Sequence, residues 1–241
     1  MKHEKKAVLI TGGSRGIGRA LVQGFERAGY LTAACATSRE SAEQSGADLS
    51  FQCDVSDVQQ VKTGLSLVQK RFGKIDVLIN NAGASGTNSL DPETDDNLWH
   101  HIVGVNLNGP YFMSKYALPL MPDRTGKIIN VASVLALKGV PDQTAYCAAK
   151  HGVLGLTRAL SHAVAPRGIT VNVVCPGWTR TDMAQGRMQE LGLTEESLKT
   201  SVPIGRFIEP SEVAQLALYL ASDLASGITG QSFTIDGGVL A

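Results

Sequence analysis

The sequence predicts one α/β domain over residues 1–241, built as a doubly wound parallel sheet of about seven strands with helices on both faces. Short apolar runs alternate along the chain with longer stretches of helical periodicity. Of the 241 residues 43% are hydrophobic, which is enough for one sizeable core. The first apolar run leads directly into a glycine-rich turn and a helix. We therefore expect ligands to bind at the carboxyl edge of the sheet, beside this turn.

The glycine-rich turn has the sequence Thr11-Gly12-Gly13-Ser14-Arg15-Gly16-Ile17-Gly18. It follows an expected strand at Ala7–Ile10 and precedes an expected helix at Arg19–Ala28, which Gly29 ends. Glycines remove Cβ atoms, and the free N–H groups at the start of the helix point into the turn, so the arrangement suits the pyrophosphate of a dinucleotide. The glycines read G-x-x-x-G-x-G, and the alternative is an ordinary strand-to-helix turn.

The end of the second expected strand, Leu31–Ala36, bears on the choice of cofactor. In open parallel sheets this edge meets the adenosine ribose, where a carboxylate would bind the 2′-hydroxyl of NAD. Thr37, Ser38 and Arg39 stand there instead, and Arg15 lies nearby in the glycine turn. Two guanidinium groups and two hydroxyls suit a 2′-phosphate, which favours NADPH/NADP+. The alternative is that both arginines are solvated surface charges.

The remaining elements continue the alternation. Further strands are expected at Leu49–Cys53, Ile75–Ile79, Lys127–Ser133, Ile169–Cys175 and Ser232–Ile235. Helices are expected near Glu40–Ser45, Val58–Phe72, Asp95–Leu107, Tyr111–Met121, Ala145–Pro166 and Val213–Ala221. Thr144 is expected to cap the helix that begins at Ala145. Residues 182–200 are expected to form a mobile helical lid or, alternatively, a plain pair of surface helices.

Composition excludes several classes of protein. Lys+Arg and Asp+Glu both total 22, so no general attraction to nucleic acid or to an anionic membrane is expected. His100 and His101 are adjacent and diverge on a helix, which argues against a metal site. Residues 1–6 are charged and no apolar signal segment is evident, so we expect a cytoplasmic protein. Scattered spacing predicts reduced core cysteines at Cys35, Cys53, Cys147 and Cys175.

The most informative pair for catalysis is Tyr146 and Lys150, which share one face of a helix. A nearby ammonium and the positive end of the helix are both expected to favour the phenolate, so Tyr146 could exchange a proton with a carbonyl or alcohol oxygen. Ser133, at the carboxyl end of a strand, could donate a hydrogen bond to the same oxygen. A Tyr-x-x-x-Lys motif without other signals is common and proves nothing.

The motifs together resemble the short-chain dehydrogenase/reductase family over Ala7 to Gly238. The glycine turn comes first, Asn80-Asn81-Ala82-Gly83 follows the fourth strand, and Ser133 precedes Tyr146 by thirteen residues. The resemblance implies a Rossmann-like fold, NADPH/NADP+ as cofactor and usually a homotetramer. It implies a catalytic set of Asn106, Ser133, Tyr146 and Lys150, in which Asn106 holds a water of a proton relay. Without the family, Asn106 would be interpreted as a hydrogen-bonded core residue.

The resemblance also implies the contacts of the cofactor. Asp54 and Val55 would meet the adenine, although Asp54 could equally be a turn residue. Lys150 would hold the nicotinamide ribose, and Thr179 would meet the carboxamide. The complete implied set is Gly12, Ser14, Arg15, Gly16, Ile17, Gly18, Thr37, Asp54, Val55, Asn81, Ala82, Gly83, Tyr146, Lys150, Pro176, Gly177, Thr179 and Thr181.

Within the family the chain most resembles 3-oxoacyl-(acyl-carrier-protein) reductases and polyketide ketoreductases, through the runs Gly12–Gly18, Gly168–Val174 and Thr181–Met183. This implies NADPH-dependent reduction of a 3-oxoacyl thioester with an acyl carrier protein as partner. Arg124 and Arg167 match positions at which such enzymes present basic side chains to the carrier, the alternative being solvated surface arginines.

One departure from this pattern keeps other functions open. The loop Ala84–Asn88 lacks the Arg/Lys-Asp pair that is common there in fatty-acid enzymes. The alternatives are therefore an NAD(P)-dependent dehydrogenase of a small alcohol, sugar or hydroxy acid and, from another class, a non-catalytic dinucleotide-binding regulator. The complete set of Asn106, Ser133, Tyr146 and Lys150 argues against the regulator, because a sensor needs no proton relay.

Overall fold

A computed structural model describes residues 5–241 of the chain, so the first part of the charged segment at residues 1–6 lies outside the described residues. Seven parallel strands form one sheet with the order β3-β2-β1-β4-β5-β6-β7. The strands are β1 (Ala7–Thr11), β2 (Leu31–Ala36), β3 (Leu49–Gln52), β4 (Val77–Asn80), β5 (Lys127–Val131), β6 (Thr170–Pro176) and β7 (Ser232–Ile235). The fold class expected from the sequence is confirmed.

The order of the strands reverses at β1, which has β2 on one side and β4 on the other. Val8 pairs with Thr32 of β2 and with Val77 of β4, both in parallel register. In open α/β sheets such a reversal opens a crevice at the carboxyl ends of the strands, because the connecting helices leave in opposite directions. The glycine turn follows β1 at this point.

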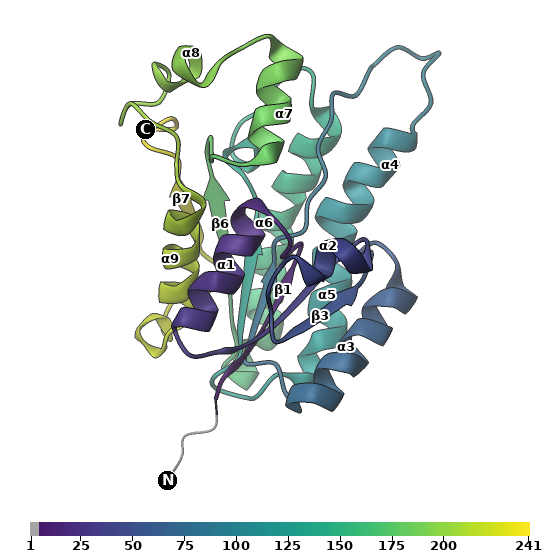
Figure 1. The fold of residues 1–241 in the computed structure, drawn as a ribbon, viewed down its shortest axis with the longest axis vertical. Coiled ribbons are helices and arrows are strands. Elements are labelled where there is room, and N and C mark those ends of the chain that lie inside the picture. The colour runs from purple at the N-terminus through teal and green to yellow at the C-terminus, as the bar shows by residue number, and fades with distance from the viewer. Residues whose placement is uncertain (1–4) are drawn as a thin grey trace.

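Helices cover both faces of the sheet (Figure 1). The α-helices are α1 (Gly16–Arg27), α2 (Arg39–Glu43), α3 (Val58–Phe72), α4 (Asn97–Val103), α5 (Gly109–Ala117), α6 (Thr144–Val164), α7 (Asp182–Leu191), α8 (Glu195–Lys199) and α9 (Pro210–Ala221). A π-helical segment, η1 (Gly104–Asn108), joins α4 to α5. Short 3-10 segments are Leu118–Leu120, Val134–Ala136, Ala165–Arg167 and Asp223–Ala225.

The strands bury side chains on both faces and so create two main cores. Leu9 of β1 packs in the cluster that includes Met113 of α5, whereas its neighbours Val8 and Ile10 pack in the cluster that includes Phe25 of α1. Side chains alternate across a strand, so such a doubly covered sheet requires a continuous apolar run rather than alternating polarity. All four cysteines, Cys35, Cys53, Cys147 and Cys175, are buried and free.

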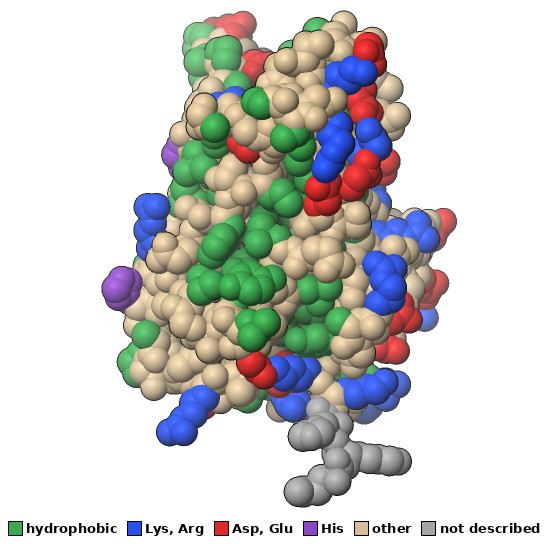
Figure 2. Space-filling model, turned by 90° about the vertical axis from the view of Figure 1, so that its left-hand side faces the viewer, with side chains coloured by type: hydrophobic (Ala, Val, Ile, Leu, Met, Phe, Trp, Pro, Cys, Tyr) green, Lys and Arg blue, Asp and Glu red, His purple; other side chains and the backbone are tan. Residues whose placement is uncertain are grey.

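One side of the molecule carries an apolar surface around α9 and β7. Figure 2 shows hydrophobic side chains gathered in the middle of this face. Tyr219 of α9 is 45% exposed, and β7 is the last strand of the sheet, so one of its edges has no neighbouring strand. Exposed apolar surface next to an open strand edge is typical of contacts between proteins. Among residues 5–241, no helix is long and apolar enough to span a membrane.

Candidate active site

The glycine turn between β1 and α1 can adopt its shape only with glycines. Gly12 and Gly16 have φ of +65° and +52°, in the left-handed region that other residues rarely adopt. A Cβ on Gly12 would lie 2.8 Å from the Cα of Ala82, and a Cβ on Gly18 would collide with the carbonyl oxygen of Gly12. Arg15 precedes the first turn of α1 without a side-chain cap, so the backbone N–H groups there can bind an anion.

Asn81 fixes the glycine turn to the end of β4. Its Nδ2 donates to the carbonyl oxygens of Thr11 at 2.9 Å and Gly12 at 3.1 Å. In return, the Thr11 hydroxyl oxygen accepts hydrogen bonds from the backbone N–H groups of Asn81 and Ala82, both at 3.0 Å. These bonds join the carboxyl ends of the neighbouring strands β1 and β4. They hold the glycine turn in a fixed position beside the crevice.

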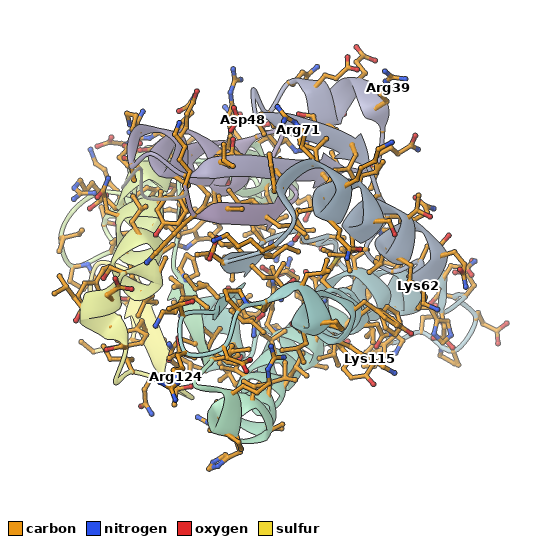
Figure 3. The ribbon with its side chains drawn as sticks, turned by 90° about the horizontal axis from the view of Figure 1, so that it is seen from below. Arg39, Asp48, Lys62, Arg71, Lys115 and Arg124 are labelled. Atoms are coloured by element: carbon orange, nitrogen blue, oxygen red, sulfur yellow. The ribbon has the colours of Figure 1, made fainter. Side chains whose placement is uncertain are left out.

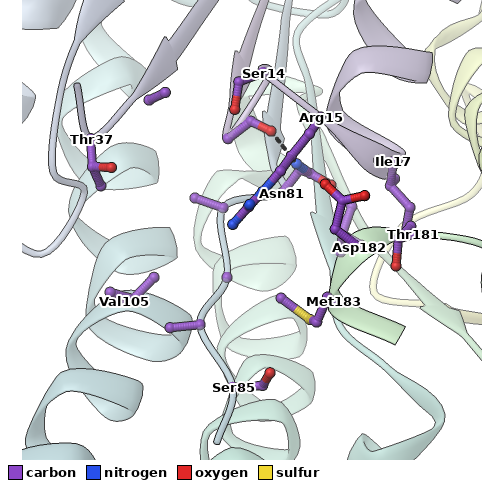
Figure 4. Close-up of a pocket in the computed structure, with 18 of the residues that line it drawn as sticks. Ser14, Arg15, Ile17, Thr37, Asn81, Ser85, Val105, Thr181, Asp182 and Met183 are labelled. Atoms are coloured by element: carbon purple, nitrogen blue, oxygen red, sulfur yellow. Dashed lines mark hydrogen bonds between the residues drawn. The ribbon is translucent and has the colours of Figure 1, made fainter. Parts of the chain in front are cut away.

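A cleft of about 590 Å³ opens at the carboxyl ends of the strands (Figure 4). Most of the sequence-predicted cofactor residues line it: Gly12, Ser14, Arg15, Gly16, Ile17, Gly18, Thr37, Asp54, Val55, Asn81, Ala82, Gly83, Tyr146, Lys150 and Thr181. An adjoining cavity of about 260 Å³ is lined by the others, Pro176, Gly177 and Thr179, and by Ser133. Tyr146, Ile17 and Thr181 line both spaces. Tyr146 therefore lies where the cleft and the cavity meet.

The two arginines expected at the ribose edge are placed differently. Arg15 lines the cleft and extends into it in Figure 4. The Arg39 side chain is 84% exposed, and its Nε donates to Glu43 at 3.0 Å on the same helix. Figure 3 shows Arg39 at the rim of the molecule. The structure thus keeps Arg15, with Thr37, as the candidate for a 2′-phosphate and turns Arg39 away from the cleft.

Asp54 has the geometry of a turn residue and also faces the cleft, so its contact with adenine remains a prediction. Its Oδ1 accepts hydrogen bonds from the backbone N–H of Ser56 at 2.9 Å and from the Ser56 hydroxyl at 2.7 Å, which is the geometry of a turn residue. Asp54 and Val55 also line the cleft. His101 and Val105, one helical turn apart, line the same cleft, which the sequence did not indicate for His101. Residues 5–241 contain no group of three His, Cys, Asp or Glu side chains that could hold a metal ion.

Ser133 leaves the sheet earlier than expected. The sequence placed it inside a strand that ends at Ser133, whereas β5 ends at Val131. The Ser133 hydroxyl oxygen accepts a hydrogen bond from the backbone N–H of Leu135 at 3.1 Å and caps the 3-10 turn Val134–Ala136. Local capping by serine competes with strand pairing, which explains the shorter strand. The hydroxyl remains at the wall of the smaller cavity.

The start of α6 is fixed by Asn88 rather than by Thr144. The backbone N–H of Ala145 donates to Asn88 Oδ1 at 3.0 Å, and Asn88 Nδ2 donates to the Thr144 hydroxyl at 2.6 Å. The expectation that Thr144 caps the helix is therefore wrong, because Thr144 lies inside the first turn. Asn88 is 57 residues away in sequence from Ala145, so no local pattern could reveal this cap. The cap holds the residue before Tyr146 and so helps to position Tyr146 at the wall of the cleft.

Tyr146 and Lys150 lie one turn apart on α6. Lys150 is 4% exposed, and its Nζ lies 5.4 Å from the centre of the Tyr146 ring. Loss of solvent raises the pKa of Tyr146 to about 12, against the effect of a hydrogen bond from Ser133, and burial lowers the pKa of Lys150 to about 8. The expected phenolate is therefore not favoured, because desolvation of the buried phenol outweighs the hydrogen bond from Ser133. A protonated phenol is instead present at neutral pH.

Asn106 lies in the π-helical segment η1, where the sequence predicted a regular helix through Leu107. It is completely buried, and its Nδ2 donates to the carbonyl oxygens of Ala84 at 2.6 Å and Ile102 at 2.9 Å. Its Oδ1 has no hydrogen-bond partner among the described residues. A Cβ on Gly83 would lie 3.0 Å from that oxygen and 3.8 Å from Lys150 Nζ. π-helical turns often occur at functional sites, and a buried acceptor of this kind suits a bound water.

A buried hydrogen-bond chain beneath the site was not predicted. Asn80 Nδ2 donates to Asn130 Oδ1 at 2.8 Å, and Asn130 Nδ2 donates to the Thr157 hydroxyl at 2.8 Å. These hydrogen bonds connect β4, β5 and α6, so they help to hold α6 against the sheet. An asparagine inside a strand that is buried on both faces, as at Asn130, is the signal that could have revealed it.

The two arginines expected to face a carrier protein also differ from each other. Arg167 donates from Nε to Asp123 at 2.7 Å and from its two terminal nitrogens to the carbonyl oxygens of Leu118 and Met121. Its guanidinium thus bonds within the protein although its side chain is 36% exposed, which makes Arg167 the weaker candidate for a contact with a carrier. Arg124, with φ of +66°, remains on the surface near the amino end of β5 (Figure 3).

The fold and the cleft define a Rossmann-like α/β protein with a glycine-rich turn built to hold an anion. A family model described as enoyl-(acyl carrier protein) reductase matches residues 12–240. The chain is 40% identical over 240 residues to the 3-oxoacyl-(acyl-carrier-protein) reductase FabG of Haemophilus influenzae, which covers 97% of this chain and 98% of that protein. The chain belongs to the short-chain dehydrogenase/reductase family.

Solved structures agree with this assignment. A variant of actinorhodin polyketide ketoreductase with NADPH has a TM-score of 0.90 and 33% identity, over 98% of this chain and 97% of that chain. The ligand-free aldohexose dehydrogenase of Thermoplasma acidophilum has a TM-score of 0.89 and 32% identity, over 98% of this chain and 94% of that chain. The similar structures thus include both a polyketide ketoreductase and an aldohexose dehydrogenase.

Proposed function

We propose that this protein reduces a 3-oxoacyl thioester to the 3-hydroxyacyl thioester with NADPH, and that Tyr146 donates the proton. The observation that carries the proposal is the position of Tyr146, which lines both the glycine-turn cleft and the adjoining cavity. A group at this junction can serve a cofactor in one space and a substrate in the other. The named 3-oxoacyl reductase and the ketoreductase with NADPH support this choice of substrate and cofactor.

The residues of the cleft fit the proposed cofactor. Any Cβ at Gly12 or Gly18 would fill the turn, and the free N–H groups at the start of α1 suit a pyrophosphate. Arg15 and Thr37 would hold the 2′-phosphate, Lys150 the nicotinamide ribose, and Thr179 the carboxamide. When bound, NADPH supplies the hydride for the carbonyl carbon.

The proton chemistry belongs to the side chains. The hydroxyls of Ser133 and Tyr146 donate hydrogen bonds to the substrate carbonyl oxygen, and Tyr146 transfers its proton as negative charge develops there. A pKa of about 12 keeps the phenol protonated before this step. Lys150 then stabilises the phenolate, and a water held by Asn106 Oδ1 returns a proton through Lys150. Burial makes the ammonium effective because solvent screens it little.

We also propose that the acyl group arrives on an acyl carrier protein, and that the enzyme acts in the cytoplasm as a homotetramer. The relatives named 3-oxoacyl-(acyl-carrier-protein) reductase support the proposal that a carrier protein delivers the substrate. The apolar face around α9 and β7 supports contacts between copies of the chain (Figure 2). Arg124 remains a candidate contact for the carrier, whereas Arg167 is occupied within the fold.

A second candidate function is oxidation or reduction of a small alcohol, sugar or hydroxy acid with NAD(P). The adjoining cavity of about 260 Å³ would accommodate such a molecule, and aldohexose dehydrogenase is among the similar structures. A non-catalytic regulator fits less well, because a sensor of the cofactor would need neither Ser133 nor Tyr146 beside the smaller cavity.

The test is turnover of acetoacetyl thioesters, free and carrier-bound, with NADPH and with NADH. We expect consumption of NADPH with both thioesters and formation of the 3-hydroxy product. Turnover of aldoses or small alcohols without turnover of either thioester would favour the second candidate. Tight NADPH binding without turnover of any of these substrates would favour the regulator.

A further inference from the structure

Arg187 is the one arginine of α7, and it points inward from a helix that is otherwise poorly packed. Among the ten residues of α7 none is buried. Figure 1 shows this helix at the end of the molecule beyond the carboxyl ends of the strands. The Arg187 side chain is nevertheless only 14% exposed, and it lines both the cleft and the smaller cavity. Apolar packing therefore does little to hold α7 in place, and polar contacts must do so.

The guanidinium of Arg187 joins three segments of the chain. One terminal nitrogen donates to Asp142 in the loop before α6. The other donates to the Thr87 hydroxyl and to Glu190 Oε2, both at 2.9 Å. Charge-assisted bonds between partly buried groups are among the stronger polar contacts in proteins. Arg187 thus connects α7 to the loop after β4 and to the loop before α6.

Both of these loops are in turn fixed to the start of the catalytic helix. The backbone N–H of Asn88 donates to the carbonyl oxygen of Asp142 at 3.2 Å, and the side chain of Asn88 caps α6 at Ala145. Thr87 and Asp142 are therefore held close to the helix that carries Tyr146. A bond from α7 to these residues sets the distance between α7 and the reacting groups.

The inner face of α7 closes the substrate cavity. Met183 and Leu191, near the two ends of the helix, line the cavity together with Arg187. Figure 4 shows Met183 projecting into the cleft near Ser85. Movement of α7 would widen the cavity on this side, because Met183, Arg187 and Leu191 would leave together.

We propose that Arg187 is a positioning residue that holds α7 closed over the substrate cavity by bonding it to Asp142 and Thr87. The identity of the substrate enclosed there rests on the proposed function, whereas the closure itself does not. Both partners lie outside α7, so loss of either should release the helix. Arg187 acts through the helix and not on the reacting atoms, because its guanidinium is already bonded to Asp142, Thr87 and Glu190.

The test is amide hydrogen exchange in the complete protein. In Arg187→Gln we expect residues 182–191 to exchange roughly tenfold faster or more, while the interior of α6 is unchanged. Asp142→Asn should also speed the exchange of residues 182–191. The exchange rate in the double variant should exceed that in either single variant by less than about twofold, because the two substitutions remove the same bond. Lys199→Gln is the matched control, since Lys199 pairs with Glu196 within α8 and lines neither space.

Kinetics give an independent second readout. Arg187→Gln should raise KM for acetoacetyl thioester about tenfold and change kcat less than about threefold, because the reacting groups stay in place. Arg187→Lys keeps the charge but can bond to fewer partners, so its KM should lie between that of the parent and that of Arg187→Gln. Unchanged exchange of α7 in Arg187→Gln, or additive effects of the two single variants, would overturn the proposal. The exchange result decides this even if the protein reduces no thioester.

Discussion

The Nζ of Lys150 lies 5.4 Å from the centre of the Tyr146 ring and donates a hydrogen bond to the carbonyl oxygen of Val131 at 3.0 Å. Burial shifts the pKa values of Tyr146 and Lys150 in opposite directions, because it disfavours the charged form of each group. It raises the pKa of Tyr146 to about 12 and lowers the pKa of Lys150 to about 8. The site therefore places a protonated phenol beside an amine that titrates close to neutral pH.

The first prediction is the pH profile of the reduction. Tyr146 stays protonated from pH 6 to 10, so its ionisation should not limit the rate. Lys150 loses its proton near pH 8, and with it the charge that stabilises the developing phenolate. We expect kcat to be level below pH 7 and to fall above about pH 8, approaching tenfold per pH unit. A rate that stays level to pH 10 would argue against a role for the Lys150 charge.

The second prediction concerns the cost of Lys150 to stability. Its pKa of about 8 in the folded protein is below the ordinary value of 10.5, so the unfolded chain binds the proton more tightly. This penalty is fully present below pH 8 and disappears as the pH rises towards 10.5. Lys150→Met should raise the free energy of unfolding at pH 7 by on the order of 2 kcal/mol, and by less at pH 10.

Denaturant unfolding at the two pH values measures this effect. Lys199→Met, at a half-exposed position on α8, is the control and should change little at either pH. A destabilised Lys150→Met protein at pH 7 would mean that the bond to Val131 outweighs the desolvation of the ammonium.

The third prediction separates the two arginines at the ribose edge. NADPH should be preferred over NADH by roughly 10- to 1,000-fold, as expected for one or two charge-assisted contacts with a phosphate. Arg15→Ala should remove most of this preference through the Kd for NADPH, because Arg15 lines the cleft. Arg39→Ala is the matched control and should remove little, since its guanidinium is exposed and paired with Glu43. Equal losses would show that Arg39 turns towards the cofactor.

The fourth prediction concerns the arginines at the opposite end of the sheet. Arg167→Gln removes bonds to Asp123 and to two carbonyl oxygens that follow α5, and it should lower the free energy of unfolding by about 1–3 kcal/mol. Arg124→Gln should cost less than about 0.5 kcal/mol, as for most surface positions. Urea unfolding of both variants measures the difference. Similar costs at the two positions would contradict the assignment of Arg167 to the fold.

Most of the fold could be predicted because its signals are local. The seven apolar runs, the glycine turn and the helix spacing each lie within a few residues, and a strand forms at each of the seven runs. Boundaries shifted where a polar residue found a local partner, as at Ser133, or where a glycine ends a helix. Gly192, with φ of +64°, ends α7 and divides the expected lid into α7 and α8.

The parts that could not be predicted depend on distant contacts. The cap from Asn88 to α6, the chain from Asn80 to Thr157 and the bonds of Arg167 connect residues far apart in sequence. The pKa of Tyr146 also escaped prediction, because spacing indicates which charges lie near the phenol but not how much solvent the fold removes from it.

The central claim is that Tyr146 supplies the proton, and Tyr146→Phe tests it most directly. The substitution removes one hydroxyl and leaves the glycine turn, Arg15 and Lys150 in place. We expect kcat for reduction of acetoacetyl thioester to fall by about 100- to 10,000-fold, while the Kd for NADPH, followed by fluorescence, changes less than about threefold. A Tyr146→Phe enzyme with kcat within threefold of the parent would contradict the account.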